Sequence, residues 1–390
     1  MAIPSSSFLI QAALAAVLAE WVRRAWRLSA FRRAYAPLEP ADPPPAAPKV
    51  TLIVPMRDEE NNAGNCLKHL FDQSYPALEI VVVDDRSSDR TPVILDKMCA
   101  LSPFPMRVVR IEKLPPGWTG KNHAMAAGAK AASGEWFLFT DADTTHSPRS
   151  VATAVRTALE RKIDFLTLAP RTEARGFWEN VVQPIAVGAL AIWFDPARVN
   201  DPASGITLAN GQFILTRRGA YESVGGNEAV RSETVEDVAL AKLTRRSGRV
   251  VAFLDGTRLY STRMYGSLAE IHRGWTRIYT HLFEKKIPVL LEKTAFFLFF
   301  SIFPFAVLGW EKLLFLEAST RFDAAVAAFA AAACAIIVAV RFAGNRMLRA
   351  NPWYALLHPL GSLILVWVLL TCVWRVAADR PSPWRGDLHK

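Results

Sequence analysis

The sequence predicts an α/β protein in which a mostly parallel sheet lies between apolar, membrane-directed ends. Between residues 50 and 143, short apolar runs of strand length alternate with helical patterns, as in βαβ units. These runs are continuously apolar, which is typical of parallel strands that are buried on both faces. Outside the middle region, apolar residues concentrate at the N-terminus and beyond residue 287.

Composition supports a membrane protein with a polar middle region. The 390 residues include 46 Lys and Arg against 36 Asp and Glu, a net charge of +10, and 51% are hydrophobic. The excess of arginine suits the anionic cytoplasmic face of a membrane. Nucleic-acid binding is the rival interpretation, but no basic stripe is interleaved with aromatic residues, so we expect no nucleic-acid partner. The four cysteines lack metal-ligand spacing and are expected to be reduced and structural.

The N-terminus is expected to anchor the chain in a membrane. Residues 1–19 carry no charged side chain, and five arginines follow between residues 23 and 33. A cleaved signal peptide would carry its positive charge before the apolar run. We therefore predict a transmembrane anchor over residues 1–24, with the next domain in the cytoplasm. Six prolines between residues 37 and 48 indicate a stiff, extended segment there, so we predict a basic and Pro-rich linker over residues 25–48.

The middle region is expected to hold seven strands. They are predicted over 50–55, 78–83, 107–111, 136–140, 164–169, 206–215 and 249–254. Helices are predicted over 61–73, 91–101, 122–132, from near Pro148 to Arg161, over 176–194, from 233–237 to Arg246, and over 268–283. The segment 176–194 is unusually apolar and is expected to lie on the membrane or to line an acceptor groove, with an ordinary buried helix as the alternative. The amphipathic segment 268–283 suits a membrane interface.

Three further apolar stretches, 294–310, 324–340 and 355–374, are long enough with their flanks to be membrane spans. Three simple crossings after the anchor would place the C-terminus outside, whereas the basic tail over 377–390 prefers the inside. A kinked or re-entrant last segment, where His358, Pro359 and Gly361 interrupt the apolar run, would resolve this conflict. We therefore expect two or three spans within residues 291–376, after an interfacial region over 263–290.

Acidic residues follow several of the predicted strands. Asp141 and Asp143 come directly after 136–140, Asp84 and Asp85 close 78–83, and Glu59 follows the first strand. Ligands of open α/β sheets bind beyond the carboxyl ends of the strands. Two carboxylates in a D-x-D spacing can face one hard cation, although such a pair alone is also a common strand-end turn. The absence of a P-loop and of G-x-G-x-x-G argues against nucleoside-triphosphate and dinucleotide cradles.

Two further features could complete a phosphate site. Lys121 precedes a predicted helix start, where a cation and free N–H groups favour anions, although Gly117-Trp-Thr-Gly120 could be a plain turn. Glu236 and Asp237 lie together at another helix start. Transfer of a sugar with inversion needs a base that deprotonates the attacking hydroxyl, and one of these acids could supply it. Helix N-terminal acids favoured by the dipole are the alternative explanation.

Four motifs together resemble the inverting family 2 glycosyltransferases. They are Ile53-Val-Pro-Met-Arg-Asp-Glu-Glu60, Val82-Val-Asp-Asp-Arg-Ser-Ser-Asp89, Thr140-Asp-Ala-Asp143 and Val235-Glu-Asp-Val238. Their order covers roughly residues 50–260. Within the family, the chain is similar to the membrane-bound hopene-associated and carotenoid-type enzymes. That similarity is carried by Leu114-Pro-Pro-Gly-Trp-Thr-Gly-Lys121, the Gly211-Gln-Phe213 segment and the ending Trp384-Arg-Gly386.

The resemblance implies a GT-A nucleotide-diphospho-sugar transferase fold over residues 49–262 and a role for each motif. Glu59 and either Asp84 or Asp85 would contact the nucleoside. Asp141 and Asp143 would handle the diphosphate and a divalent metal (Mn²⁺ or Mg²⁺), with Asp143 as the direct ligand. Lys121 would neutralise phosphate, and Asp237, beside Glu236, would be the catalytic base. The full donor set is Pro55, Arg57, Glu59, Asp84, Asp85, Lys121, Asp141, Arg273 and Trp275, and the acceptor region holds Gly211, Gln212, Trp178 and Trp193.

One departure from the family bears on the reaction. Processive polymerases of the family carry Q-x-x-R-W, whereas the counterpart here reads Ile271-His-Arg-Gly-Trp275, so that only Arg273 or Arg277 could replace the arginine. This favours a single sugar transfer over polysaccharide synthesis. A processive synthase, a non-catalytic membrane scaffold, a transporter and a nucleotidyltransferase are the alternatives.

The resemblance therefore implies a multi-pass enzyme of the bacterial inner membrane whose catalytic domain faces the cytoplasm. It would move one sugar from a nucleotide-diphosphate sugar, with a UDP-sugar preferred, to a lipid acceptor in the bilayer. Hopanoid, carotenoid and polyprenyl acceptors all suit the apolar segments.

Overall fold

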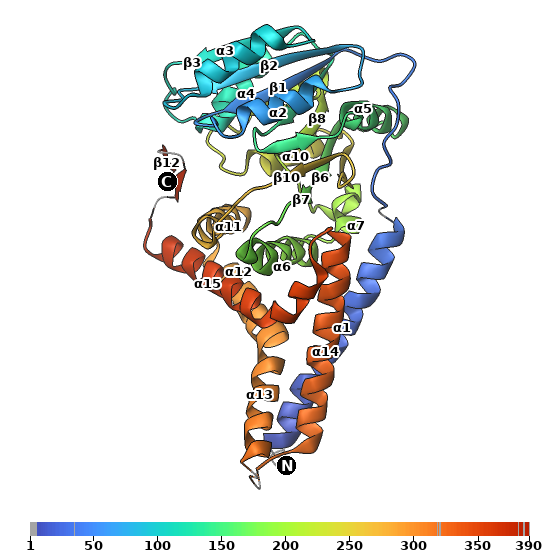
Figure 1. The fold of residues 1–390 in the computed structure, drawn as a ribbon, viewed down its shortest axis with the longest axis vertical. Helices are drawn as coiled ribbons and strands as arrows, with labels where there is room; N and C mark the ends of the chain where they lie inside the picture. Colours follow the sequence, from blue (N-terminus) through green and yellow to red (C-terminus); the bar gives the residue numbers. More distant parts are fainter. Residues whose placement is uncertain are drawn as a thin grey trace.

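A seven-stranded sheet in the order β3-β2-β1-β4-β8-β6-β9 forms the centre of the upper domain in the computed structural model (Figure 1). Its strands are β1 (Val50–Met56), β2 (Leu78–Asp85), β3 (Met106–Ile111), β4 (Trp136–Thr140), β6 (Phe165–Ala169), β8 (Phe213–Arg217) and β9 (Val251–Asp255). All neighbouring pairs are parallel except those that involve β8. The predicted α/β class with a mostly parallel sheet is confirmed.

The structure describes residues 6–34, 36–317, 319, 321–380, 382–384 and 387–389. The short strands β11 (Ser382–Trp384) and β12 (Asp387–His389) pair near the C-terminus. Arg385, Gly386 and Lys390, which belong to the predicted basic tail, lie outside the described residues.

Helices cover both faces of the sheet because its strands are apolar on both sides. They are α2 (Ala63–Phe71), α3 (Thr91–Leu101), α4 (Gly120–Ala131), α5 (Ser150–Glu160), α8 (Arg218–Ser223), α9 (Gly226–Ala229) and α10 (Glu236–Arg246). One core cluster includes Leu52, Leu138 and Leu215. Their sequence neighbours Ile53, Phe139 and Ile214 belong to a second cluster. The alternation of neighbouring residues between two clusters is the period-two pattern of strands buried on both faces.

The single antiparallel strand brings a distant segment to the carboxyl edge of the sheet. Parallel β1, β2 and β4 all end at this edge, with Met56 opposite Asp84 and Ile53 opposite Phe139. Strand β8 runs the other way, so its first residue, Phe213, lies opposite Thr140, the last residue of β4. The residues just before β8 therefore meet the loops that follow β1, β2 and β4.

The predicted strand over 206–215 is wrong in its first part. Residues 206–212 form a loop, and β8 begins only at Phe213. The Asn210 backbone is held by a side chain, since its N–H donates to Thr167 Oγ1 at 2.9 Å. The next N–H, of Gly211, donates to Asp237 Oδ2 at 2.7 Å. These groups bond to side chains and cannot continue the ladder of the sheet.

A smaller sheet, in the order β5-β10-β7, lies between the large sheet and the helices beneath it. It consists of β5 (Thr144–His146), β7 (Arg171–Thr172) and β10 (Tyr260–Thr262). Because β5 begins directly after Asp143, this sheet fixes the far side of the D-x-D turn.

A layer of helices joins the sheet domain to the long apolar helices (Figure 1). It contains α6 (Phe177–Trp193), α11 (Leu268–Leu282), α12 (Ile287–Phe297) and α15 (His358–Ala377), whose apolar residues form one cluster. We call these four helices the interfacial layer. Two bonds lock α6 to α11: Trp275 Nε1 donates to Gln183 Oε1 at 2.7 Å, and the Tyr279 hydroxyl donates to the Ala186 carbonyl at 2.9 Å. Short α7 (Pro196–Val199) and η1 (Pro202–Ser204) follow α6.

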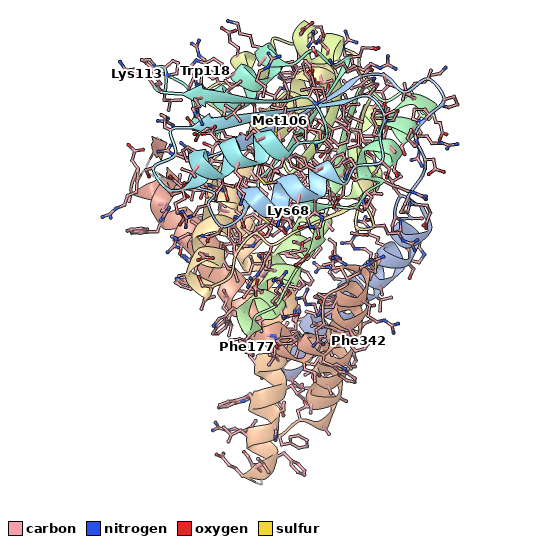
Figure 2. The ribbon with its side chains drawn as sticks, turned by 45° about the horizontal axis from the view of Figure 1, so that its top comes forward. Lys68, Met106, Lys113, Trp118, Phe177 and Phe342 are labelled. Carbon is pink, nitrogen blue, oxygen red and sulfur yellow. The ribbon has the colours of Figure 1, made fainter. Side chains whose placement is uncertain are left out.

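Within the described residues, four helices are long and apolar enough to cross a membrane: Ser6–Ala30, Ile287–Leu316, Ala324–Met347 and Pro352–Ala377. The second joins α12 through the π-helical turn η2 (Leu298–Ile302) to α13 (Phe303–Leu316). Helix α14 (Ala324–Met347) and the turn η3 (Pro352–Leu357) lead to α15. Figure 1 shows α1, α13 and α14 extending together away from the sheet, while α15 crosses under α6 and α11. Figure 2 places Phe177 and Phe342 toward this end and Lys113 and Trp118 at the opposite one.

Helix α1 (Ser6–Ala34) continues past the predicted anchor boundary at residue 24. The first part of the predicted basic and Pro-rich linker, up to residue 34, is therefore helical. The physical reason is that residues 20–34 contain good helix formers and neither glycine nor proline, whereas the first proline of the linker is Pro37.

The contact between α15 and α6 depends on a glycine. A Cβ atom at Gly361 would lie 2.4 Å from Ile185 Cδ1 and 2.6 Å from the Val181 carbonyl oxygen, which belongs to backbone and cannot move aside. We expect Gly361→Ala to cost about 1–3 kcal/mol by overpacking and to lower the thermal unfolding midpoint of the detergent-purified protein. Gly309→Ala on α13, where nothing lies within 4 Å, is the control and should leave the midpoint unchanged or higher. Equal midpoints for the two variants would contradict this account.

Candidate functional site

The carboxyl edge of the large sheet holds a cavity of about 180 Å³. Eight residues of the predicted donor, metal and acceptor sets line it: Pro55, Arg57, Glu59, Asp85, Lys121, Asp141, Asp143 and Gln212. They come from the end of β1 and the loop after it, the end of β2, the loop after β4, the start of α4 and the loop before β8. The sheet topology therefore brings together side chains from five separate segments.

The D-x-D turn is fixed by buried hydroxyl groups that the sequence did not suggest as site residues. Thr144 Oγ1 donates to the Asp141 carbonyl oxygen at 2.7 Å, and Thr140 Oγ1 donates to the Gln212 carbonyl oxygen at 2.9 Å. His146 Nε2 lies 2.9 Å from Thr140 Oγ1 and 3.1 Å from Thr144 Oγ1. Burial lowers the pKa of His146 to about 3, so this imidazole is neutral. The sequence signal that could have identified this network is the pair of threonines on both sides of the D-x-D, followed by a nearby histidine.

Lys121 lies between carboxylates from two distant parts of the chain. Its Nζ is 2.9 Å from Asp141 Oδ1 and 3.0 Å from Glu236 Oε1. Burial alone would lower the pKa of Lys121, but Asp141 and Glu236 outweigh this effect and the pKa lies well above its ordinary value. The ammonium group is thus a permanent, partly buried positive charge beside the D-x-D turn.

The position of Lys121 follows from the start of α4. Thr119 caps this helix by accepting a hydrogen bond from the Asn122 N–H at 3.3 Å. The buried Asn122 side chain then donates to the carbonyl oxygens of Val230 at 2.8 Å and Glu233 at 2.9 Å. Because Glu233 lies just before α10, these bonds tie the start of α4 to the start of α10 and bring Lys121 to Glu236.

Asp237 is oriented by backbone N–H groups. Its Oδ2 accepts from the Gly211 N–H at 2.7 Å and its Oδ1 from the Val238 N–H at 2.8 Å. Burial raises the pKa of Asp237 to about 7, and the Glu236 carboxylate adds to the rise, while Lys121 and the two N–H groups oppose it. The space at Gly211 is tight, because a Cβ atom would lie 3.0 Å from Lys121 Nζ and 3.2 Å from Glu236 Oε1, so a larger residue would press on both side chains.

At the end of β2, the structure distinguishes between the two aspartates that were candidates for contacting the nucleoside. Asp85 lines the cavity and pairs with Arg86, whose Nε donates to Asp85 Oδ1 at 2.8 Å. Asp84 is buried beside it and accepts from the Ser87 N–H at 3.2 Å. Glu59 is held in place because its N–H donates to Thr91 Oγ1 at 2.8 Å. Of the two aspartates, only Asp85 reaches the cavity.

Helix α11 supplies another wall of the cavity, through one of the two arginines that the sequence offered but not through Trp275. Tyr265, which precedes the helix, and Arg277 line the cavity, whereas Arg273 is exposed and Trp275 is buried against Gln183. The departure from Q-x-x-R-W has a direct explanation. A Cβ atom at Gly274, where the motif has arginine, would lie 2.1 Å from the Tyr265 ring. The tyrosine occupies the space beside this helix face that a larger residue would need.

Trp178 and Trp193 do not line the cavity. They lie at opposite ends of α6 within the interfacial layer. The Trp178 ring packs against Phe177 with centroids 5.0 Å apart, and Trp193 packs against Tyr279 at 5.4 Å and Phe283 at 5.2 Å. The other lining residues that the sequence did not mark are Met56, Ala124, Ala142 and Met264. They carry no polar side-chain pattern that could have identified them.

The residues present fit a metal ion that is shared with a phosphate. Asp141 and Asp143 both line the cavity and offer hard carboxylate oxygens. Within the described part of the chain, no cluster of three or more His, Cys, Asp or Glu side chains could enclose a metal. Magnesium-like ions commonly bind one or two carboxylates and complete their shell with water and substrate phosphate oxygens. The arrangement therefore suits a metal that arrives with its ligand and not an all-protein metal centre.

Comparison with protein families confirms the resemblance predicted from the motifs. Residues 51–225 match the model described as Glycosyl transferase family 2. The chain is also similar to the 4,4'-diaponeurosporenoate glycosyltransferase of Staphylococcus aureus strain MRSA252, with 24% identity over 263 residues. This alignment covers 65% of the chain and 66% of the relative, which is just under two thirds of the relative's length.

Among solved structures, the chain is similar to a mannosyltransferase from Pyrobaculum calidifontis, determined in complex with GDP-Man and Mn²⁺. The TM-score is 0.56 at 18% identity, and the alignment covers 95% of this chain and 99% of that one. At this identity the likeness concerns the fold alone. It confirms the predicted GT-A fold together with its apolar flanking helices.

The geometry around Asp237 generates a testable pKa. We expect the protonated carboxyl band of Asp237, isolated by subtracting the infrared spectrum of Asp237→Asn, to disappear as the pH rises through about 7. Glu236→Gln removes a neighbouring negative charge and should lower this midpoint. Glu233→Gln, which alters an exposed acid three residues earlier, should leave it unchanged. A midpoint near the ordinary value of an aspartate, or one that is equal in the wild type and Glu236→Gln, would contradict the assigned environment.

Proposed function

Residues 51–225 match glycosyl transferase family 2, and from that premise we propose that the protein transfers one sugar from a nucleotide-diphosphate donor to a lipid acceptor, with inversion. One observation carries the proposal. The D-x-D turn, the partly buried cation of Lys121 and the Glu236–Asp237 pair meet at the same edge of the sheet, where Lys121 contacts both Asp141 and Glu236. The transfer needs all three elements: carboxylates that hold the metal and diphosphate, a cation that stabilises the departing charge, and a base for the attacking hydroxyl.

In this proposal, the donor lies along the carboxyl edge of the sheet. Glu59 and Asp85 face the nucleoside, and the neighbouring Pro55 and Arg57 line the same wall. Asp141 and Asp143 would hold a divalent metal, which offsets the charge that develops on the departing diphosphate when it is bound. Lys121 supplies a second positive charge at a fixed position, where it costs little reorganisation as the leaving group departs.

Asp237 is the proposed base. The acceptor oxygen attacks the anomeric carbon while the bond from that carbon to the diphosphate oxygen breaks on the opposite face. The hydroxyl proton passes to Asp237, and the bonding electron pair leaves with the nucleoside diphosphate. The raised pKa of Asp237 makes it a stronger base than an ordinary aspartate near neutral pH. The Gly211 N–H holds Oδ2, which leaves the orientation of the carboxylate fixed.

The acceptor is proposed to approach from the interfacial layer. Tyr265 and Arg277 form the wall of the cavity on this side, and Gly211 and Gln212 lie at the sheet edge opposite. Trp178 and Trp193 belong to the apolar layer that such an acceptor would traverse. A carotenoid, hopanoid or polyprenyl chain has the apolar character that this route requires. The relative from Staphylococcus aureus is named for a carotenoid-derived acceptor, which supports this class.

The arrangement of helices supports a cytoplasmic catalytic domain at the inner membrane of a bacterium. The start of α1 lies beside the connection between α13 and α14, because the Ser7 hydroxyl donates to Asp323. If α1, α13 and α14 cross and α15 lies in the interface, an external N-terminus places both the sheet domain and Arg375 on the cytoplasmic side. This topology satisfies the preference of basic residues for the inside.

Donor binding tests the first half of the proposal. We expect calorimetry on the detergent-purified protein to show saturable, metal-dependent binding of one nucleotide sugar, with UDP-sugars as the proposed donors and GDP-sugars as the comparison. Asp143→Ala should abolish the dependence on Mn²⁺ or Mg²⁺, whereas Asp72→Ala, an exposed control at the end of α2, should bind like the wild type. Failure of folded protein to bind any nucleotide sugar would favour a scaffold or a lipid-linked donor. Release of pyrophosphate during turnover would indicate a nucleotidyltransferase.

Loss of the base tests the second half. We expect Asp237→Asn to retain donor affinity and to lose about 10²–10⁴-fold in kcat, the usual contribution of general base catalysis. The kcat/KM of the wild type should rise with pH through about 7, since the carboxylate form is the active one. Glu233→Gln is the matched control and should keep wild-type rates. A loss below tenfold in Asp237→Asn would overturn the assignment of the base and point to an acceptor that is already ionised. Products with several added sugars would indicate a processive synthase.

A further inference from the structure

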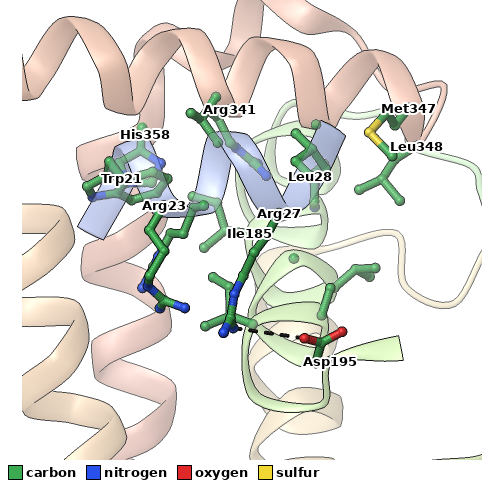
Figure 3. Close-up of a pocket in the computed structure, with 18 of the residues that line it drawn as sticks. Trp21, Arg23, Arg27, Leu28, Ile185, Asp195, Arg341, Met347, Leu348 and His358 are labelled. Atoms are coloured by element: carbon green, nitrogen blue, oxygen red, sulfur yellow. Dashed lines mark ion pairs between the residues drawn. The ribbon is translucent and has the colours of Figure 1, made fainter. Parts of the chain in front are cut away.

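A second cavity, of about 250 Å³, lies where α1, α6, α14 and α15 meet (Figure 3). None of its lining residues lines the cavity at the sheet edge. Its walls come from the basic end of α1, the middle of α6, the last turns of α14 and the first residue of α15. This place is the junction between the long apolar helices and the interfacial layer.

The lining is strongly basic for a site among apolar helices. Four arginines, Arg23, Arg24, Arg27 and Arg341, line it together with a single carboxylate, Asp195. Figure 3 shows the only ion pair drawn between these residues, that of Arg27 Nη1 with Asp195 Oδ2 at 3.9 Å. Outside the cavity, Glu20 binds Arg24 Nε at 2.9 Å and also pairs with Arg23. The described carboxylates thus leave positive charge in excess.

Several buried polar atoms at this cavity have no hydrogen-bond partner within the described residues. The Arg341 side chain is 8% exposed, and its Nε and Nη2 make no hydrogen bond. Arg24 is 7% exposed, and the same holds for its Nη1 and Nη2, although its guanidinium lies over the Trp21 ring at 4.6 Å. His358 is 3% exposed, and its Nδ1 is also without a partner while its Nε2 lies 3.2 Å from Ser362 Oγ.

Such unpaired polar atoms are rare in folded proteins and call for a ligand. Most buried polar groups are hydrogen-bonded, and leaving a buried charge unpaired costs several kcal/mol. An ionisable residue inside a membrane-spanning helix is therefore a candidate functional group, with a partner of opposite charge. The partner at this site must accept hydrogen bonds, because guanidinium groups only donate. The four arginines against one lining carboxylate favour an anionic acceptor.

The rest of the lining is apolar. Leu28, Ile185, Ile192, Val340, Met347 and Leu348 complete the walls. Ligand pockets for whole drug-sized molecules usually measure about 300–1,000 Å³, so this smaller space suits a charged head group and the first part of an apolar chain. A guanidinium pair beside apolar walls, at the basic end of α1, matches the anionic lipids of a cytoplasmic leaflet.

We propose that this cavity binds the anionic phosphate head group of a membrane lipid, with Arg24 and Arg341 as its ligands and the apolar walls around the start of its chain. The proposal is independent of the proposed transfer reaction. An anionic phospholipid and a polyprenyl phosphate share this chemistry, and the test below distinguishes them. Planar guanidinium groups suit such a ligand because they can hold phosphate oxygens through two parallel hydrogen bonds.

Native mass spectrometry and thermal unfolding of the full-length protein in a neutral detergent test the site. We expect phosphatidylglycerol or a polyprenyl phosphate, whichever is the natural occupant, to form a one-to-one adduct and to raise the unfolding midpoint, since a ligand that binds only the folded state stabilises it. Phosphatidylcholine and inorganic phosphate are the controls and should do neither. Equal binding of phosphatidylcholine would overturn a site for an anionic lipid. An equal effect of inorganic phosphate would reassign the cavity to a free anion.

Variants connect the binding to the two arginines. We expect Arg341→Gln to weaken lipid binding at least about tenfold, as removal of one partner of a buried charge pair does elsewhere. Arg346→Gln, an exposed change on the same helix, is the matched control and should bind like the wild type. Without lipid, Arg341→Gln should unfold at the same or a higher temperature than the wild type, because it removes an unpaired buried charge. Arg24→Gln provides a second, independent variant. Unchanged lipid binding in both Arg341→Gln and Arg24→Gln would overturn the proposal.

Discussion

The contact of the partly buried Lys121 ammonium group with two carboxylates is the interaction on which the sheet domain depends. This cation neutralises Asp141 on one side and Glu236 on the other, two carboxylates that would otherwise repel each other and Asp237 in a partly buried space. The D-x-D turn and the start of α10 are far apart in the sequence, and the cation links them. A Cβ atom at Gly211 would lie only 3.0 Å from this ammonium group, so the space beside it is tight.

The direction of one strand makes that meeting possible. In a purely parallel sheet, the residues before a strand lie at the amino edge, far from the loops that follow its neighbours. Because β8 is antiparallel to β4, its preceding loop reaches the carboxyl edge, where the Gly211 N–H orients Asp237. Residues 206–212 form a loop outside the sheet. The N–H groups of Asn210 and Gly211 donate to Thr167 and Asp237 and not to a neighbouring strand.

The interfacial layer connects this chemistry to the apolar helices. Helix α11 contributes Arg277 to the sheet-edge cavity and Trp275 to the contact with α6, so the same helix faces both the proposed donor site and the membrane side. Helix α6 in turn lines the basic cavity on its other side through Ile185. A lipid head group at Arg341 would therefore contact the layer that positions the membrane-side wall of the site. In this proposal, the arginines of α1 contribute to lipid binding in addition to setting the orientation of the chain in the membrane.

The sequence alone determined the α/β class, most strand positions, the membrane-directed ends and the site residues that belong to ordered motifs. Periodicity and strand-end carboxylates are local signals, and they are read without knowing what lies next to them. Tertiary structure decided what depends on contacts between distant segments. It placed Asp85 and not Asp84 at the cavity, Arg277 and not Arg273 on its wall, and Trp178 and Trp193 away from it. Local pattern also could not show that residues 206–212 leave the sheet or that α1 continues through its arginines. Nor could it show that Arg24, Arg341 and His358 meet around one cavity, because their proximity arises from the packing of three helices.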